Sequence, residues 1–397
     1  MTTMTGRKRG GTSTRTLTQL PPTNSPPLLP FDLVAEILCC LPVKHLLQLR
    51  CVCKSWNSLI SHDSKFAKNH LRLSTSNHDR HDLILVSAAP LFYLSGCSIS
   101  SIFSSAASFT SFKWLNNHRL ILNLKGDYIG RVTTCDGMVC VRIDESLAFL
   151  CNPSIRKFKI LPPLINPSQK YLQTSFTLVY DRFTSNYKII ALSVRDYYQK
   201  NREINVHTLG TDYWKGIHDF PNRHLIQGPG IFLSDSLHWL PYDGRSGSSG
   251  KVIVSLHLQK ESYQELSHPL YDIQSETDNT LGMLRDCLCI FSNSDKFFDV
   301  WIMKEYGNGQ SWTKLLSVPQ MGDAYIYILT KPLYISEHDQ VLMYFMKRRK
   351  FSLAVYDSIN DTYKIPEIQG NIQVPMEGRF YFPYVYIESL ISPFFQD

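Results

Sequence analysis

A chain of 397 residues, 43% hydrophobic and 12% aromatic, can form one small module with one large domain, or two medium domains. The net charge of +7 overstates how basic the folded part is, because Arg7, Lys8, Arg9 and Arg15 precede the first acid, Asp32. The remaining charge is mild, which makes nucleic acid an unlikely main partner. No run of about eighteen apolar residues occurs, so we expect a soluble, intracellular chain with no membrane partner.

The ten cysteines are irregularly spaced, and four of them fall in the helical stretch of residues 29–73. Cys287 and Cys289 form one close pair and Cys51 and Cys53 another, but neither has a companion pair at zinc-finger spacing. We therefore expect reduced thiols and no metal or other cofactor.

Residues 1–28 consist largely of Thr, Ser, Pro, Gly and basic residues, with little to bury, and are predicted to be disordered. The cluster of residues 7–9 is compatible with a nuclear-entry signal, or with solubility alone. The expected location is the cytoplasm, the nucleus or both.

Residues 29–73 predict a small module of three helices. Apolar residues recur at helical spacing over three successive stretches that begin at Leu33, Val43 and Trp56. The first helix is expected to end at Leu41, because Pro42 disfavours a helical residue before it and is suited to open the next helix. About forty residues cannot bury enough apolar surface alone, so part of this surface is expected to meet a partner.

A further short helix over 65–71, capped by Ser64, is expected to follow. The run Arg50–Trp56 (RCVCKSW), within the longer pattern that starts at Leu29, resembles the F-box of plant proteins, the module that binds the adaptor of Skp-cullin-F-box (SCF) ubiquitin ligases. By this resemblance, the adaptor-binding residues are Leu29, Pro30, Leu33, Ile37, Leu38, Leu41, Pro42, Val43, Leu46, Val52 and Trp56.

Three positions depart from the F-box pattern: Cys40 and Gln48 stand where Arg is expected, and His45 where Ser is expected. Two alternatives to an F-box are an N-terminal cap on the larger domain and a helix-turn-helix DNA reader. DNA reading is disfavoured because the basic residues are scattered around the helices and offset by acids.

Residues 74–82 (STSNHDRHD) are polar and predict a linker to the second domain, residues 83–397. His78 and His81 have the spacing of metal ligands, but a flexible linker cannot fix ligand geometry, so we expect them to be solvated.

The second domain predicts an all-β propeller. Five aromatic residues that close short β-rich segments recur about every fifty residues, at Phe158, Trp214, Tyr263, Trp312 and Tyr363. A period of this length, built of short strands and Gly, Asp and Ser turns, is typical of propeller blades. Extended backward, it places another blade across 83–130, so six or seven blades fit, giving an α+β multidomain chain. A large β-sandwich is the alternative.

Within this domain, residues 133–140, 151–158 and 179–190 resemble the F-box-associated domain of plant F-box proteins, which is kelch-like or propeller-like. Cys151 takes the place of the tryptophan usual before Asn152-Pro153. Together the two resemblances imply a substrate-recognition subunit of an SCF ubiquitin ligase, whose adaptor links it to cullin and RING subunits. A scaffold acting outside any cullin ligase is the alternative.

Catalytic patterns are absent from the sequence. Residues 244–250 lack the spacing of a nucleophile elbow and the lysine of a phosphate-binding loop. His207, His238 and His257 fall on or near predicted strands, where a structural histidine is commoner than a catalytic one. A copper oxidase of the kelch-like type would need a Tyr, Cys and His set that the sequence does not assemble. We therefore expect a non-catalytic protein.

Loops on one rim of the propeller are the expected target-binding surface, with residues 193–203, 241–250, 271–280 and 304–311 as the longest connections. The first combines tyrosine with basic residues, a composition typical of interface hot spots. The candidate target-binding residues are Arg195, Tyr197, Tyr198, Lys200 and Arg202. Alternatively, the two tyrosines continue a strand.

Overall fold

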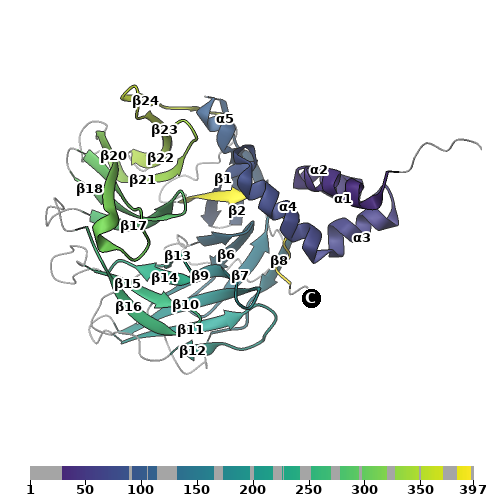
Figure 1. The fold of residues 1–397 in the computed structure, drawn as a ribbon, viewed down its shortest axis with the longest axis horizontal. Coiled ribbons are helices and arrows are strands. Elements are labelled where there is room, and N and C mark those ends of the chain that lie inside the picture. The colour runs from purple at the N-terminus through teal and green to yellow at the C-terminus, as the bar shows by residue number, and fades with distance from the viewer. Residues whose placement is uncertain are drawn as a thin grey trace, which may run out of the picture.

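The computed structural model describes residues 29–88, 92–104, 106–113, 132–164, 173–196, 201–217, 226, 228–241, 252–269, 278–294, 297–319, 327–347, 350–369 and 382–394. In this part of the chain, four N-terminal helices lie beside a β-propeller (Figure 1). The predicted disordered tail, residues 1–28, lies outside the described residues. No described helix is long and apolar enough to cross a membrane.

The helices occur where the apolar spacing predicts them. They are α1 (Phe31–Cys39), α2 (Val43–Leu49), α3 (Lys54–His62) and α4 (Ser64–Ser76). Pro42 is the residue before α2, as expected from its fixed φ. The fourth helix is longer than predicted, and Asp63 rather than Ser64 caps it, since the Asp63 carboxylate accepts a 2.8 Å hydrogen bond from the Phe66 amide.

Six four-stranded antiparallel sheets form the propeller, which confirms the predicted fold class. Blade 1 consists of β26 (Phe382–Ile387), β1 (His81–Ala88), β2 (Phe92–Ser98) and β4 (Thr110–Lys113); blade 2 of β5 (Val132–Cys135), β6 (Met138–Arg142), β7 (Ala148–Asn152) and β8 (Lys157–Ile160); blade 3 of β9 (Gln173–Asp181), β10 (Asn186–Asp196), β11 (Asn201–Thr208) and β12 (Lys215–Ile217). Blade 4 consists of β13 (Ile231–Leu233), β14 (Ser236–Trp239), β15 (Val252–His257) and β16 (Ser262–Ser267); blade 5 of β17 (Asp278–Leu284), β18 (Cys287–Asn293), β19 (Phe297–Met303) and β20 (Trp312–Pro319); blade 6 of β21 (Tyr327–Ile335), β22 (Gln340–Lys347), β23 (Lys350–Asp357) and β24 (Thr362–Lys364).

Each blade buries both faces against its neighbours, so its middle strands are buried along most of their length instead of alternating between buried and exposed residues. Every residue of β6 and β7 is buried. Cys151, in the place of the usual tryptophan, is fully buried in the core between blades 1 and 2. None of the ten cysteines forms a disulfide.

The recurring aromatic residues lie on or beside the fourth strand of successive blades and connect each blade to the one before it. The Trp214 indole donates a 2.9 Å hydrogen bond to the Pro162 carbonyl, and the Trp312 indole donates one of 2.9 Å to the Ser267 carbonyl. Tyr363 makes the same kind of contact from blade 6 to blade 5. The fifty-residue period therefore reports contacts between blades as well as the blades themselves.

The ring closes through the C-terminal strand. β26 pairs antiparallel with β1, joining Val385 to Leu83 and Ile387 to His81. A second contact lies nearby, where β25 (Glu367–Gln369) pairs in parallel with β3 (Ala106–Ser108), next to the short helix α5 (Ile99–Phe103). The prediction of a complete blade within 83–130 is therefore wrong in one respect, because its innermost strand comes from the other end of the chain.

The predicted solvated linker, residues 74–82, is structured instead. α4 runs to Ser76, a 3-10 turn (η1) spans His78–Arg80, and β1 begins at His81. His81 is buried, and its Nδ1 lies 3.2 Å from the Tyr334 hydroxyl of blade 6 while its Nε2 lies 3.1 Å from the Thr75 carbonyl. The polar residues of this segment form hydrogen bonds where the helices pack against the propeller.

Connections between strands alternate between the two rims of the propeller, since each blade is an antiparallel meander. First-to-second turns such as Asp136–Gly137 and Arg285–Asp286 have two residues at positive φ, the geometry of tight hairpins. These turns and the third-to-fourth connections share one rim. The second-to-third and blade-to-blade connections share the other.

Candidate interaction surfaces

The end of α1 is held in place by side chains of α4 and η1. The carbonyl at the end of α1, Cys40, accepts from the Arg80 guanidinium, and Leu41 O lies 2.9 Å from His70 Nε2. Burial lowers the pKa of His70, so its ring is neutral and donates through Nε2. Arg80 places a positive charge where the helix dipole favours one. The exit of α1 is thus fixed by α4 and η1.

The segment after β26 forms a seat between the helices and blade 2. Asn152, fully buried at the end of β7, donates through Nδ2 to Ser389 O at 3.0 Å, Ser389 Oγ at 3.1 Å and Ile391 O at 2.8 Å. Leu390 and Ile391 belong to the same apolar cluster as the helix residues. The Asn-Pro motif of blade 2 therefore positions the tail on which the helices rest.

Glu388 continues this seat toward α2. Burial raises the pKa of its carboxyl group, whereas a hydrogen bond with the Val43 amide at the start of α2 and the nearby Arg80 charge lower it. The neighbouring Asp82 carboxyl group has its pKa raised to about 7, first by burial and then by the Glu388 charge. The carboxyl groups of Asp82 and Glu388 are therefore both partly shielded from water where the F-box meets the propeller.

The predicted adaptor-binding residues divide by exposure. Exposed or half-exposed are Leu29, Pro30, Leu33, Ile37, Leu41, Pro42, Val52 and Trp56, and buried in the module are Leu38, Val43 and Leu46. Helical spacing identifies an apolar side chain but does not tell a core contact from an outward one. The buried residues can act only by shaping the surface above them.

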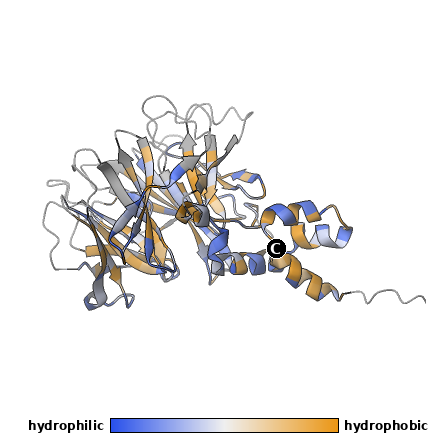
Figure 2. Cartoon of the chain, turned by 90° about the horizontal axis from the view of Figure 1, so that it is seen from above, coloured by the Kyte–Doolittle hydropathy of each residue, from blue (hydrophilic) through white to orange (hydrophobic). Residues whose placement is uncertain are grey.

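An apolar surface remains uncovered on α1 and on the α2–α3 connection. Leu33 and Ile37, one turn apart on α1, are 44% and 57% exposed, and Val52 is 60% exposed. Phe31 is also exposed; the sequence reasoning missed it although it directly follows Pro30. Figure 2 shows α1, next to the thin N-terminal trace, as hydrophobic over much of its length. Exposed apolar residues gathered in so small a module indicate a protein interaction site.

The predicted target-binding residues lie mostly outside the described part of the chain. Tyr197, Tyr198 and Lys200 fall there, and Arg195 lies in β10, where its side chain is not described. Arg202 lies in β11 with only 3% of its surface exposed, and its Nε donates to the Ile226 carbonyl at 3.3 Å. The expectation of an exposed Arg202 does not hold, because the strand extends further into the predicted loop.

The four predicted target-binding loops do not gather on one rim. Residues 193–203, 241–250 and 271–280 belong to second-to-third or blade-to-blade connections, whereas 304–311 join the third strand to the fourth in blade 5. Tyr306 in this last loop contacts blade 4, its hydroxyl lying 2.8 Å from His238 Nε2. Burial lowers the pKa of His238 to about 4, so this histidine is a neutral structural group. No group of three or more His, Cys, Asp or Glu side chains arranged to hold a metal occurs among the described residues.

Comparison with known proteins agrees with this architecture. The family model of the F-box associated beta propeller domain matches residues 91–393, and that of the F-box domain matches residues 27–68. The chain belongs to the F-box proteins that carry this propeller. It is 30% identical over 385 residues to the F-box/kelch-repeat protein At3g23880 of Arabidopsis thaliana, covering 93% of this chain and 97% of that protein.

Other Arabidopsis thaliana F-box proteins are similar to this one at greater distance. F-box protein CPR1 is 24% identical over 341 residues, covering 79% of each chain. F-box/WD-40 repeat-containing protein 1 is 25% identical over 394 residues, covering 92% of this chain and 88% of that protein. The plant F-box and F-box-associated resemblances read from the sequence are thereby confirmed.

Proposed function

We propose that this F-box protein is the substrate-recognition subunit of an SCF-type ubiquitin ligase. The F-box docks on a Skp-family adaptor, which connects it to the cullin and RING subunits, and the propeller holds a target protein for ubiquitination. The protein supplies binding surfaces and no catalytic group. The observation that carries the proposal is the uncovered apolar surface of Leu33, Ile37 and Val52.

This surface fits a partner rather than the rest of the chain. The F-box already has a core of its own, with Leu38 and Leu46 buried, and it already rests on the propeller through Leu390 and Ile391. The outward side chains of α1 take part neither in the F-box core nor in the contact with the propeller. F-box domains typically bind Skp1-like adaptors, so we assign this surface to the adaptor.

Substitution of Ile37 by aspartate tests the assignment. Fully burying an isoleucine contributes about 1.5–3 kcal/mol, and burying an unpaired carboxylate costs several more. Ile37→Asp is therefore expected to weaken adaptor binding at least about a hundredfold. Because Ile37 is exposed in the free protein, its melting temperature should stay within a few degrees. Leu41→Asp is less clean, since Leu41 packs against the F-box core.

Ile359→Asp is the matched control, because Ile359 is 77% exposed in the β23–β24 turn of blade 6. Co-purification with a Skp-family adaptor should be retained by this variant and lost by Ile37→Asp. Equal retention by both variants would rule out the proposed docking surface.

The alternative of a scaffold outside a cullin ligase predicts adaptor binding without cullin. Affinity purification of the intact protein, followed by detection of cullin, separates the two. The Ile37→Asp protein is also the proper bait for targets, since captured targets are then not degraded. We place target binding on the propeller. Its candidate residues remain Arg195, Tyr197, Tyr198 and Lys200.

A further inference from the structure

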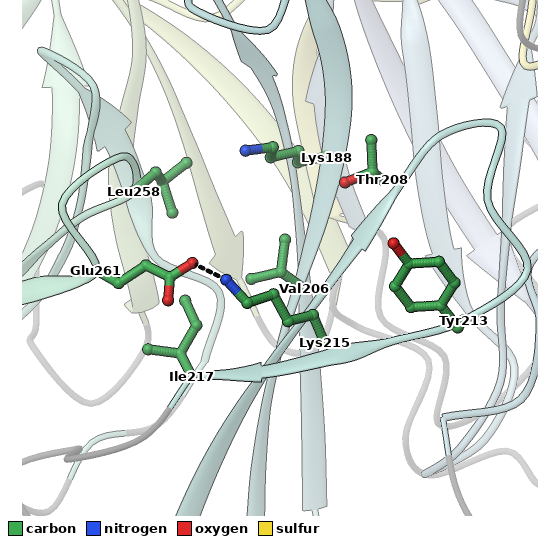
Figure 3. A pocket seen from close by; sticks show the side chains of 8 residues that line it. All are labelled: Lys188, Val206, Thr208, Tyr213, Lys215, Ile217, Leu258 and Glu261. Carbon is green, nitrogen blue, oxygen red and sulfur yellow. Dashed lines mark hydrogen bonds and ion pairs between the residues drawn. The ribbon is translucent and has the colours of Figure 1, made fainter.

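A pocket of about 110 Å³ lies between blade 3 and blade 4. Its lining comes from β10, β11, β12 and the β11–β12 and β15–β16 turns, and consists of Lys188, Val206, Thr208, Tyr213, Lys215, Ile217, Leu258 and Glu261 (Figure 3). The pocket exists because the strand register places Lys188 beside Thr208 and Lys215 beside Val206 on one face of blade 3. Polar residues there replace the apolar ones that fill the rest of this interface.

The floor of the pocket is apolar. Ile217 and Leu258 are buried, Val206 is half-buried, and all three belong to the apolar cluster shared by blades 3 and 4. A cavity of this size holds only a few water molecules. It therefore suits a single aliphatic side chain rather than a large ring system.

The rim of the pocket carries two ammonium groups and one carboxylate. Lys188 is held in place, since its Nζ lies 2.7 Å from Asp181, which also accepts from the Phe183 amide at 2.9 Å and from Thr184 Oγ1 at 2.8 Å. Burial alone would raise the pKa of Asp181, but these hydrogen bonds hold it below its usual value. This lysine is a fixed part of the wall.

The ion pair of Lys215 is more exposed to solvent than that of Lys188. Lys215 Nζ lies 2.5 Å from Glu261 Oε1, but the two side chains are 61% and 39% exposed, and exposed ion pairs of this kind contribute little. Figure 3 shows this ion pair among the lining side chains, with the Tyr213 hydroxyl turned toward Thr208. An incoming carboxylate can therefore replace Glu261 at Lys215 with little loss.

The strand beside the pocket is the edge of its blade. β12 contributes Lys215 and Ile217 to the pocket and pairs with β11 on one side; among the described residues no strand pairs with its other side. An exposed edge strand offers backbone N–H and C=O groups that can form hydrogen bonds with an extended peptide. A pocket next to the edge can bind one side chain of that peptide.

We propose that this pocket binds the C-terminal end of an extended polypeptide whose last residue is aliphatic. A terminal residue carries a carboxylate and a side chain on the same carbon, which matches the Lys215 ammonium group and the apolar floor that line one pocket. An internal Asp or Glu offers the charge without the apolar group. The inference rests on the proposed function, because it makes the chain end of a target the feature that the propeller recognises.

Fluorescence polarisation with labelled octapeptides tests this on the full chain. One pool ends in valine with a free carboxylate and random residues before it, the second is the same pool amidated at its C-terminus, and the third is amidated and ends in glutamate. The free-acid pool should bind at least about tenfold more tightly than both others, the loss expected for one charge-assisted hydrogen bond. Equal binding of the three pools, or no binding of the free-acid pool, overturns the proposal. Binding led by the glutamate pool overturns it in favour of an acidic side chain.

Three variants locate the binding in the pocket. Lys215→Ala should weaken free-acid binding about tenfold, whereas Glu261→Gln, which removes the competing carboxylate, should strengthen it about twofold to fivefold. Lys260→Ala, an exposed lysine in the same turn but outside the lining, is the control and should change nothing. Lys215→Ala behaving like Lys260→Ala overturns the proposal.

Adaptor binding is measured on the same proteins. Lys215→Ala should keep the adaptor and Ile37→Asp should keep the peptide. Failure of the peptide assay alone refutes the pocket, and failure of the adaptor assay alone refutes the ligase assignment.

Discussion

Replacement of Asn152 by alanine is expected to destabilise the protein strongly, because one amide joins blade 2 to the tail beneath the F-box. Besides its three donated contacts to Ser389 and Ile391, its Oδ1 accepts from the Ser154 amide at 2.9 Å and from the Tyr386 hydroxyl at 3.1 Å. Each buried partner left without a hydrogen bond costs about 1–3 kcal/mol. Allowing for water that enters the vacated space, we expect a loss of about 3–5 kcal/mol.

Urea unfolding followed by tryptophan fluorescence measures this loss, and limited proteolysis reports whether the F-box has detached. Asn360→Ala is the control, because Asn360 is exposed in the β23–β24 turn and, among the described residues, its amide side chain donates to Asp357 in the same turn. Its effect should stay within about 0.5 kcal/mol. If Asn152→Ala cost less than about 1 kcal/mol, or left cleavage between F-box and propeller unchanged, the seat would not hold the F-box.

Three further changes test the fold. Gly137→Ala should cost about 1–3 kcal/mol, since φ is 74° there and an added Cβ would lie 2.3 Å from Ser389 Oγ and 2.6 Å from Ile387 O; Gly307→Ala, at φ 84° with nothing within 4 Å, isolates the backbone contribution in the same unfolding assay. Asp82, with its pKa raised to about 7, binds a proton in the native state that the unfolded chain releases from about pH 4 upward, so its contribution to stability falls as pH rises to about 7. Asp82→Asn should therefore stabilise the protein more at about pH 8 than at about pH 5, and an unchanged difference between these pH values would contradict this. Trp312→Phe keeps an aromatic side chain but removes the indole N–H that the Ser267 carbonyl accepts, together with part of the buried ring, so denaturant unfolding should show a loss of at least about 1–2 kcal/mol, and no loss would argue against the contact between blades 4 and 5.

The sequence predicted the elements that depend on local pattern. Helical spacing located α1 to α3, and the aromatic period located the blades, because Trp214, Trp312 and Tyr363 repeat the same contact. Contacts between distant segments left no local signal. β26 pairs with β1, about 300 positions earlier, and no pattern in the sequence of β26 indicates this pairing.

The candidate sites were predictable to a similar degree. The F-box pattern identified the right segment but could not separate the buried Leu38 from the exposed Ile37, one position apart on α1. The pocket was missed, because Lys188, Lys215 and Glu261 meet only through strand pairing and the packing of two blades. The polar connector was misread, because the sequence does not show that His81 meets Tyr334.

The closing strand also bears on how this protein is made. Translation proceeds at about 5–20 residues per second, so the F-box helices emerge well before β26 and the tail that follows it. Until those last residues leave the ribosome, blade 1 lacks its innermost strand and the F-box lacks its seat. A message that ends early would yield a helical module without the packing of Leu390 and Ile391 and with no fixed orientation to the propeller. If the F-box binds an adaptor as proposed, such a product would occupy the adaptor without presenting a target in a defined position.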